Sequence, residues 1–317
     1  MVCNSNTRLK KWFEHFNIQF CHLDLIKNEY FKSVSQCSLD YWDEFILKPN
    51  SKIYKFSAID YHLMFQIHND VIRTQRYWKY FNKNSLSNFK RKNDISFDYD
   101  GHLRRLERIM YIFACENPKI SYLQGFNELL MPLYYCALKE LKELDAVEAV
   151  AFTFFKKLIL NTKLISIYVK KDGCNKLSKT ISVFSKLVSK HLPQINKMIK
   201  NLKIEPIFYC LKWFSLMFAQ NYDLNAILIL WDNLFEHLDD LLNYLFFIGL
   251  SHLHYLEKEI DENNPSQTIK LLQMCQLDLH IHDIIEFAEE EYINDLNTRN
   301  SYFDKMVCIF NLAKEFF

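Results

Sequence analysis

The sequence is poor in the two residues that most often interrupt regular structure. Only 4 glycines and 6 prolines occur among its 317 residues. A β-sandwich or β-barrel needs many tight turns and uses both residues freely, so this shortage argues against such folds and favours long helices. Half of the residues are apolar, which is enough for a sizeable core in a chain of this length.

The sequence also lacks an excess of charge and a long apolar run. Lys and Arg together number 39 and Asp and Glu 38, so no overall electrostatic field favours nucleic acid or an anionic membrane as partner. The most apolar stretch, residues 241–253, is too short for a membrane span and is interrupted by Asn243 and Ser251. Residues 1–11 lack the apolar core of a signal peptide. We expect a cytoplasmic protein that contacts membranes only through a partner, with recruitment to endomembranes left open.

Motifs for metal or nucleotide binding are scarce as well. The 9 cysteines are odd in number and none forms a Cys-x-x-Cys pair, which favours reduced, buried thiols. His252 and His254, like His280 and His282, stand two residues apart, and such residues do not share a helix face. A zinc hydrolase is therefore the weakest alternative, and we expect no metal site. Without a Gly-rich phosphate loop, the chain should not bind nucleotide by itself.

The apolar pattern predicts the organisation of the chain. Apolar residues recur at intervals of three and four, for example over residues 103–113 and 224–234, which predicts amphipathic helices. Helix breaks are expected at Pro49, residues 82–101, Asn117-Pro118, residues 171–173, Pro193, Pro206 and residues 261–265. We predict an all-α fold with an N-terminal helical flank (1–40), an N-terminal lobe (41–170) and a C-terminal lobe (171–317).

The first informative motif is Ile-His-Asn-Asp-Val-Ile-Arg-Thr at residues 67–74. On a helix, Asp70 and Arg73 would share a face, so the carboxylate would brace the guanidinium group. Ile67 and Thr74 would turn towards another side, where they can be buried. Taken alone, an Asp/Arg pair at this spacing is most often a surface ion pair.

The second motif is Tyr-Leu-Gln-Gly-Phe-Asn at residues 122–127. Pro118 is expected to end the preceding helix, which places Gln124 near the junction between a loop and the next helix. Gly125 permits a close backbone approach there, and Asn127 is a candidate cap for the new helix. Taken alone, Gln124 is most often a capping or surface amide.

Together the two motifs, Ile-x-x-Asp-x-x-Arg-Thr and Tyr-x-Gln-Gly-x-Asn, resemble those of the TBC domain family of GTPase-activating proteins for Rab GTPases. Further likenesses are Leu-Glu-Arg-Ile-Met around Arg108, Lys212-Trp213, and Trp-Asp-Asn-Leu-Phe from Trp231 and Asp232 onwards. The resemblance covers about residues 41–260. The sequence has Ser121, Phe126 and Lys212 where the family usually has Gly, Met and Arg, and none of these changes removes a central residue of either motif.

The resemblance implies an all-α, two-lobed TBC domain in which two side chains complete a partner's active site. Arg73 would be an arginine finger that stabilises charge on the γ-phosphate, and Gln124 a glutamine finger that aligns the attacking water. Supporting roles would fall to Asp70, Thr74, Tyr122, Gly125 and Asn127. Structural roles would fall to Ile67, Arg108, Trp213, Trp231 and Asp232.

By the same resemblance, the chain would be a GTPase activator in vesicle trafficking and not an enzyme. Its partner would be a Rab-type GTPase in the GTP-bound form, which would itself carry the GTP and Mg²⁺, so the chain needs no cofactor of its own. The alternative is a catalytically silent helical adaptor that binds a GTPase or another trafficking protein. Intact Arg73 and Gln124 favour activation, because a pure binder has no need of both.

Overall fold

The computed structural model describes residues 7–37, 60–74, 77, 80, 99–162, 164, 167, 176–274 and 276–314. Every regular element in these ranges is a helix, which confirms the predicted all-α class. The longer helices are α1 (Arg8–His15), α2 (Leu23–Gln36), α4 (Tyr61–Val71), α5 (Tyr99–Glu116), α6 (Phe126–Glu140), α7 (Leu144–Asn161), α9 (Lys176–His191), α10 (Pro193–Asn201), α11 (Ile207–Ser215), α12 (Leu224–Glu236), α13 (Leu241–Leu256), α14 (Pro265–Met274) and α15 (Ile281–Lys314). None of the helices described here is both long and apolar enough to cross a bilayer.

Four prolines mark helix boundaries as the sequence predicts, whereas Pro132 lies inside α6. Helix α5 ends just before Asn117-Pro118, and Pro193 and Pro265 each open a helix, where the missing N–H costs no hydrogen bond. Pro206 directly precedes α11. The predicted break over residues 82–101 extends too far, because α5 already begins at Tyr99. The predicted break at Pro49 and the lobe boundary at residues 171–173 lie outside the described residues.

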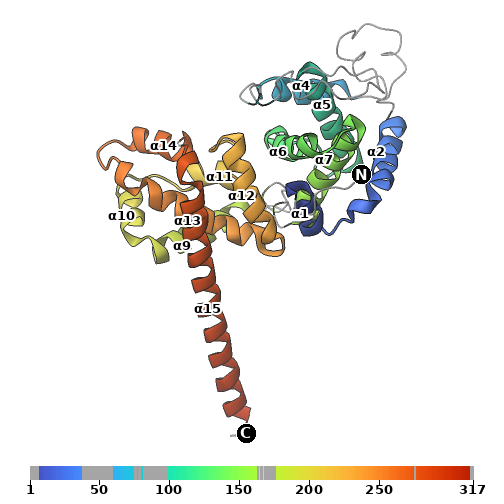
Figure 1. The fold of residues 1–317 in the computed structure, drawn as a ribbon. Coiled ribbons are helices and arrows are strands. Elements are labelled where there is room, and N and C mark those ends of the chain that lie inside the picture. Colours follow the sequence, from blue (N-terminus) through green and yellow to red (C-terminus); the bar gives the residue numbers. More distant parts are fainter. Residues whose placement is uncertain are drawn as a thin grey trace.

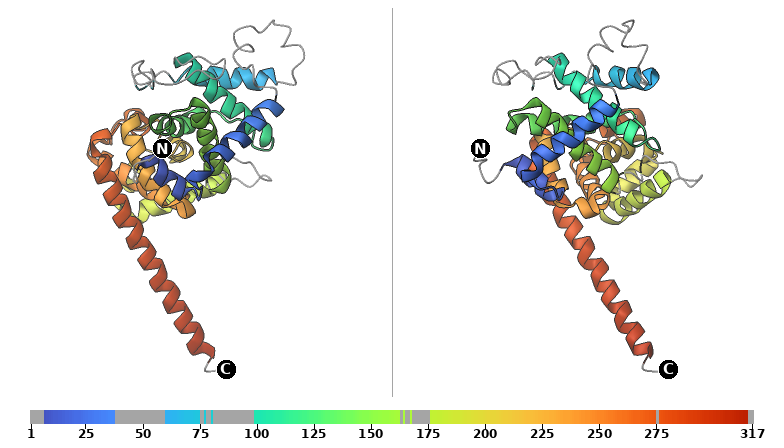
Figure 2. Two further views of the ribbon diagram at one scale, coloured as in Figure 1. Left: turned by 45° about the vertical axis from the view of Figure 1, so that its right-hand side comes forward. Right: turned by 90° about the vertical axis from the view of Figure 1, so that its right-hand side faces the viewer.

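Two groups of helices lie next to each other in Figure 1. Helix α7 packs against α2, α5 and α6 in one group, while α13 packs against α9, α11 and α15 in the other. Helix α15 leaves the second group as a straight arm in all three views of Figures 1 and 2. Its 34 residues make it about 50 Å long.

The N-terminal helix α1 ties the two groups together. It contacts α6 of the first group and α12 of the second. Asp232 on α12 accepts hydrogen bonds from Arg8 Nε at 2.8 Å and from Trp12 Nε1 at 2.8 Å, and the backbone N–H of Leu9 donates to Glu140 Oε1 on α6 at 3.0 Å. Asp232 therefore anchors the flank to the domain and lies outside the polar site described below.

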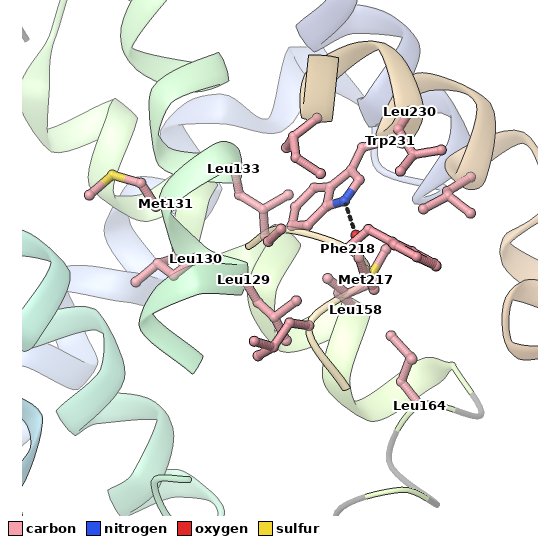
Figure 3. Packing of buried hydrophobic residues seen from close by; sticks show 14 of the residues in the cluster. Leu129, Leu130, Met131, Leu133, Leu158, Leu164, Met217, Phe218, Leu230 and Trp231 are labelled. Carbon is pink, nitrogen blue, oxygen red and sulfur yellow. Dashed lines mark hydrogen bonds between the residues drawn. The ribbon is translucent and has the colours of Figure 1, made fainter. Parts of the chain in front are cut away.

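One apolar core runs through both groups. Leu129 and Leu133 of α6 lie close to Trp231 of α12, and Met217 and Phe218 complete the contact (Figure 3). The indole of Trp231 is fully buried and donates to the carbonyl oxygen of Met217 at 3.0 Å. Because side chains in such a core are close-packed, the relative orientation of the two groups is fixed.

A buried ion pair holds the first group together. Arg108 of α5 donates from Nε and Nη2 to the two carboxylate oxygens of Glu148 on α7, at 2.7 and 2.8 Å. The hydroxyl of Tyr30 on α2 donates to the same carboxylate at 2.6 Å. Arg105 Nε also lies 3.9 Å from Glu148, so the carboxylate faces two buried guanidinium groups. Removing Glu148 would deprive both of this partner, at a cost of about 3–5 kcal/mol. Arg108 therefore links three helices at a distance from solvent.

Candidate functional site

Helix α4 carries the first motif to the surface. Asp60 caps its first turn by accepting from Leu63 N at 3.1 Å, and Ile67 and Val71 are fully buried. The helix ends at Val71, so Arg73 lies in the turn that follows and not on the helix as expected. The backbone N–H of Arg73 donates to Asp70 O at 3.3 Å, which keeps the two residues of the predicted pair close together.

The Asp70 carboxylate is shared between two neighbours. One oxygen lies 3.6 Å from Arg73 Nη1, and the other accepts a hydrogen bond from the Tyr122 hydroxyl at 2.9 Å. Burial and the negative charge of Asp70 raise the pKa of Tyr122 well above its usual value, so the phenol stays protonated as a donor. The Asp70 side chain is 11% exposed and that of Arg73 is 72% exposed. The guanidinium group of Arg73 therefore extends into solvent, while the Asp70 carboxylate beside it is buried and held in place by Tyr122.

Asn127 and Thr74 hold the backbone around this pair. Asn127 is buried in the first turn of α6, and its Nδ2 donates to the backbone oxygen of Asp70 at 3.3 Å. The expectation that Asn127 caps α6 is wrong, because the helix begins at Phe126 and Gly125 is its N-cap. The hydroxyl of Thr74 donates to the Val71 carbonyl oxygen and closes the turn after α4. The side chain of Asn127 in the second motif is thus bonded to the main chain of the first motif.

Gly125 lets the second motif approach the second group of helices. Its φ is +103°, a region that side chains of L-residues rarely adopt. A Cβ at this position would lie 2.7 Å from Leu216 Cδ2. Gln124, immediately before it, is exposed. The glycine therefore fixes both the path of the loop and the place where the Gln124 side chain emerges.

We expect Gly125→Ala to destabilise the loop that carries Gln124. The unfavourable φ should cost about 1–3 kcal/mol, and Leu216 would also have to move. Urea unfolding should show the loss. Gly249→Ala is the matched comparison, because it introduces crowding without a positive φ. A Cβ there would meet Phe184 and Phe214 at 3.0 and 3.1 Å, and the residue lies inside α13. If Gly125→Ala is as stable as the unchanged protein, the strained turn is not needed.

Both motifs open into one cleft with a volume of about 430 Å³. Asp70, Arg73 and Gln124 line its first side. The opposite side is formed by residues of α11 and the segment after it, namely Ile207, Phe208, Leu211, Lys212, Ser215, Leu216 and Gln220. Arg73 and Gln124, which are distant in sequence, therefore face the same open space between the two groups of helices.

Glu128 is a residue of this cleft that the motifs did not indicate. It is buried in the first turn of α6, where a carboxylate is favoured by the helix dipole. Its two oxygens accept from Gln220 Nε2 at 2.9 Å and from the Tyr77 hydroxyl at 3.2 Å. Glu128 thus links the chain just after Arg73 to the second group. An acidic residue directly after Asn127 was the only sequence signal for this role.

The two residues of the Lys212-Trp213 dipeptide lie in different surroundings, one in the cleft and one in the core. Lys212 lines the cleft, whereas Trp213 is fully buried and donates from Nε1 to the Leu272 carbonyl oxygen at 3.1 Å. The charged residues along the described lining are Asp70, Glu128, Arg73 and Lys212. These four formal charges cancel, but both carboxylates are buried and accept hydrogen bonds within the chain, whereas the Arg73 side chain is 72% exposed. The guanidinium group of Arg73 is therefore the charge of this cleft that is accessible to an anionic group from outside.

The paired histidines do not converge on a metal ion. His252 is buried beside Trp213 and its Nδ1 lies 2.9 Å from the Tyr222 hydroxyl, whereas His254 is exposed and stacks on Phe287. His280 and His282 are both exposed. Within the described ranges, no three His, Cys, Asp or Glu side chains are grouped so that they could hold a metal.

His252 should make stability depend on pH. Burial lowers its pKa from 6.5 to about 3, so between these values the unfolded chain binds a proton that the folded chain does not. The stabilisation is present above pH 6.5 and is lost as the pH falls, by about 2 kcal/mol between pH 7 and pH 5. Urea unfolding at both pH values should show a weaker dependence in His252→Gln than in the control His254→Gln. If the free energy of unfolding changes equally with pH in both variants, the assignment to His252 is contradicted.

The fold and the cleft define an all-helical protein with an exposed arginine and an exposed glutamine between two packed groups of helices. The sequence model of the Rab-GTPase-TBC domain matches residues 26–260, and the chain belongs to this family. The match confirms the resemblance drawn from the two motifs. It begins at Ile26, earlier than the point near residue 41 from which the resemblance was traced.

Individual proteins that are similar in sequence carry names of the same family. Human TBC1 domain family member 13 is 27% identical over 194 residues, which cover 60% of this chain and 47% of that protein. A TBC domain-containing protein of Schizosaccharomyces pombe is 29% identical over 188 residues, covering 54% of this chain and 30% of its own length. The chain thus spans less than half the length of these curated relatives.

A solved structure shares the fold. The crystal structure of the Ypt/Rab-GAP domain of Gyp1p superposes with a TM-score of 0.64 at 16% sequence identity, covering 90% of this chain and 88% of that one. At this identity the likeness concerns the fold alone. It agrees with the all-α arrangement described above.

Proposed function

We propose that this chain accelerates GTP hydrolysis on a Rab-type GTPase by inserting Arg73 and Gln124 into the partner's nucleotide site. The observation that carries the proposal is that both side chains, from separate motifs, are exposed in one open cleft. Family membership supports it. The partner supplies GTP and Mg²⁺, and the chain supplies only the two side chains and the surface that positions them.

Arg73 stabilises the negative charge that develops on the transferred phosphoryl group. In GTP hydrolysis, water attacks the γ-phosphorus, the bond to the β-phosphate oxygen breaks, and negative charge spreads over the phosphoryl oxygens. A guanidinium group presents several donors in a planar fork and stabilises that charge at more than one oxygen. Asp70 lies 3.6 Å from Arg73 Nη1 and orients the guanidinium group, and Tyr122 orients Asp70 in turn. This arrangement lowers the entropy lost when Arg73 enters the site.

Gln124 acts on the nucleophile. Its amide has both a donor and an acceptor, so it can hold the attacking water in line with the breaking bond while touching the partner's backbone. Gly125 and Asn127 fix the loop from which it extends. The Glu128–Gln220 hydrogen bond of 2.9 Å holds the two sides of the cleft at a constant separation around it.

A hydrolysis screen tests the proposal. Purified chain is added in catalytic amount to a panel of Rab GTPases loaded with GTP, and phosphate release is followed over time. We expect at least one partner to hydrolyse GTP about a thousandfold or more faster, as in other arginine-finger systems. Partners that bind tightly without any acceleration would instead support the adaptor.

A further inference from the structure

Two exposed apolar side chains stand at the edge of the cleft opposite the fingers. Ile207 and Phe208, at the start of α11, are 41% and 54% exposed, and both line the cleft. Ile72, which directly precedes Arg73 and does not line the cleft, is 39% exposed. Single exposed apolar residues need no explanation, but neighbouring ones at the rim of a cleft that also carries charged side chains are typical of a protein interface.

The backbone that carries the Ile207–Phe208 edge is held in place. Phe208 N donates to Glu205 O at 3.0 Å, and Phe208 O accepts from the side chain of Gln273 on α14. One and five residues further along α11, Tyr209 and Trp213 are buried in the core. The two apolar side chains therefore extend from a helix end whose backbone is already held in place. Little conformational entropy is lost from this backbone when a partner covers them.

The position of this edge identifies its occupant, provided that the proposed function holds. A γ-phosphate that reaches Arg73 and Gln124 must lie inside the cleft, and in small GTPases the loops that contact the γ-phosphate are the two switch segments. Those loops then come against the wall that faces the fingers, which is α11. Lys212, Ser215 and Gln220 line the same cleft and add polar groups to it, as is typical of the rim of an interface.

We propose that Ile207 and Phe208 are the apolar anchor on which the switch segments of the GTP-bound partner dock. The anchor contacts a surface that is formed before the chemical step and persists through it. It therefore stabilises the ground state and the transition state equally, which lowers KM and leaves kcat unchanged. Arg73 and Gln124 are proposed to act in the transition state alone, so their replacement should lower kcat and leave KM nearly unchanged. The anchor also favours the GTP-bound form, because the γ-phosphate orders the switch segments.

The test compares Ile207→Ala/Phe208→Ala with the unchanged chain on the GTPase that responds in the hydrolysis screen. We expect KM to rise at least about tenfold with kcat within about twofold, and the affinity for the GTP-bound partner to fall by a similar factor. Ile293→Ala on α15 and Leu25→Ala on α2 are controls, because their side chains are 46% and 53% exposed and neither lines the cleft. Phe208→Leu should retain most of the affinity.

The outcomes separate this inference from the proposed function. If the unchanged chain stimulates hydrolysis and the double variant keeps its KM, the anchor is wrong and the finger mechanism stands. If the double variant loses kcat and keeps KM, the edge acts in the chemical step and the docking role is overturned. If the unchanged chain stimulates no GTPase, both proposals fall. Thermal unfolding should be nearly unchanged in the double variant, since both side chains are exposed.

Discussion

Arg73→Lys should reduce the stimulation of GTP hydrolysis by at least about a hundredfold. Lysine keeps the positive charge but offers a single ammonium group where the guanidinium group reaches several phosphoryl oxygens. Partner binding should survive, because the charge and the rest of the cleft remain. Single-turnover hydrolysis on a responsive GTPase measures the loss, and titration with the same GTPase measures the affinity.

The neighbouring Asp70 provides a graded comparison for this result. In the proposed mechanism Asp70 orients the guanidinium group from 3.6 Å and does not itself act on the phosphoryl group, so Asp70→Ala should cost less than Arg73→Lys. A variant with Lys at position 73 that stimulates as well as the unchanged chain would show that the guanidinium group has no part in catalysis. An Asp70→Ala loss as large as that of Arg73→Lys would assign Asp70 more than an orienting role.

Gln124→Ala should lower the stimulation by a similar order of about a hundredfold, because the water is then no longer held in line with the breaking bond. The comparison is Gln267→Ala, which removes an exposed amide on α14 outside the cleft. Single-turnover rates at saturating chain isolate the chemical step from binding. Equal rates for Gln124→Ala and Gln267→Ala would contradict the glutamine-finger role.

The two fingers should not act independently. Both are proposed to act on one transition state, so Arg73→Lys/Gln124→Ala should be little slower than the slower single variant. Two losses that multiply would mean that each residue contributes separately. The same single-turnover assay distinguishes these outcomes.

Local chemistry was enough to predict much of the fold. The period of the apolar residues predicted helices over 103–113 and 224–234, and α5 and α12 contain these ranges. Breaks were predicted at Pro193 and at residues 261–265, and α10 and α14 begin at Pro193 and Pro265, because a residue without an N–H fits the first turn of a helix. These features depend only on residues close together in sequence, which is why a sequence alone can show them.

The parts that were missed depend on distant residues. Asn127, expected to cap α6, instead donates to the carbonyl oxygen of Asp70, which is 57 residues away, while Gly125 occupies the N-cap position. Glu128 gains its position from Gln220, which is 92 residues away. The contact of α1 with Asp232 spans both groups of helices. Such pairings have no periodic or motif signature in the sequence.

A transition-state mimic tests the central claim most directly. The affinity of the chain for the responsive GTPase is measured with GDP alone and with GDP plus aluminium fluoride, which occupies the place of the transferred phosphoryl group. If Arg73 and Gln124 complete the partner's active site, the aluminium fluoride complex should bind at least about a hundredfold more tightly. Arg73→Lys or Gln124→Ala should each remove most of that gain. Equal affinities with and without aluminium fluoride would contradict the account.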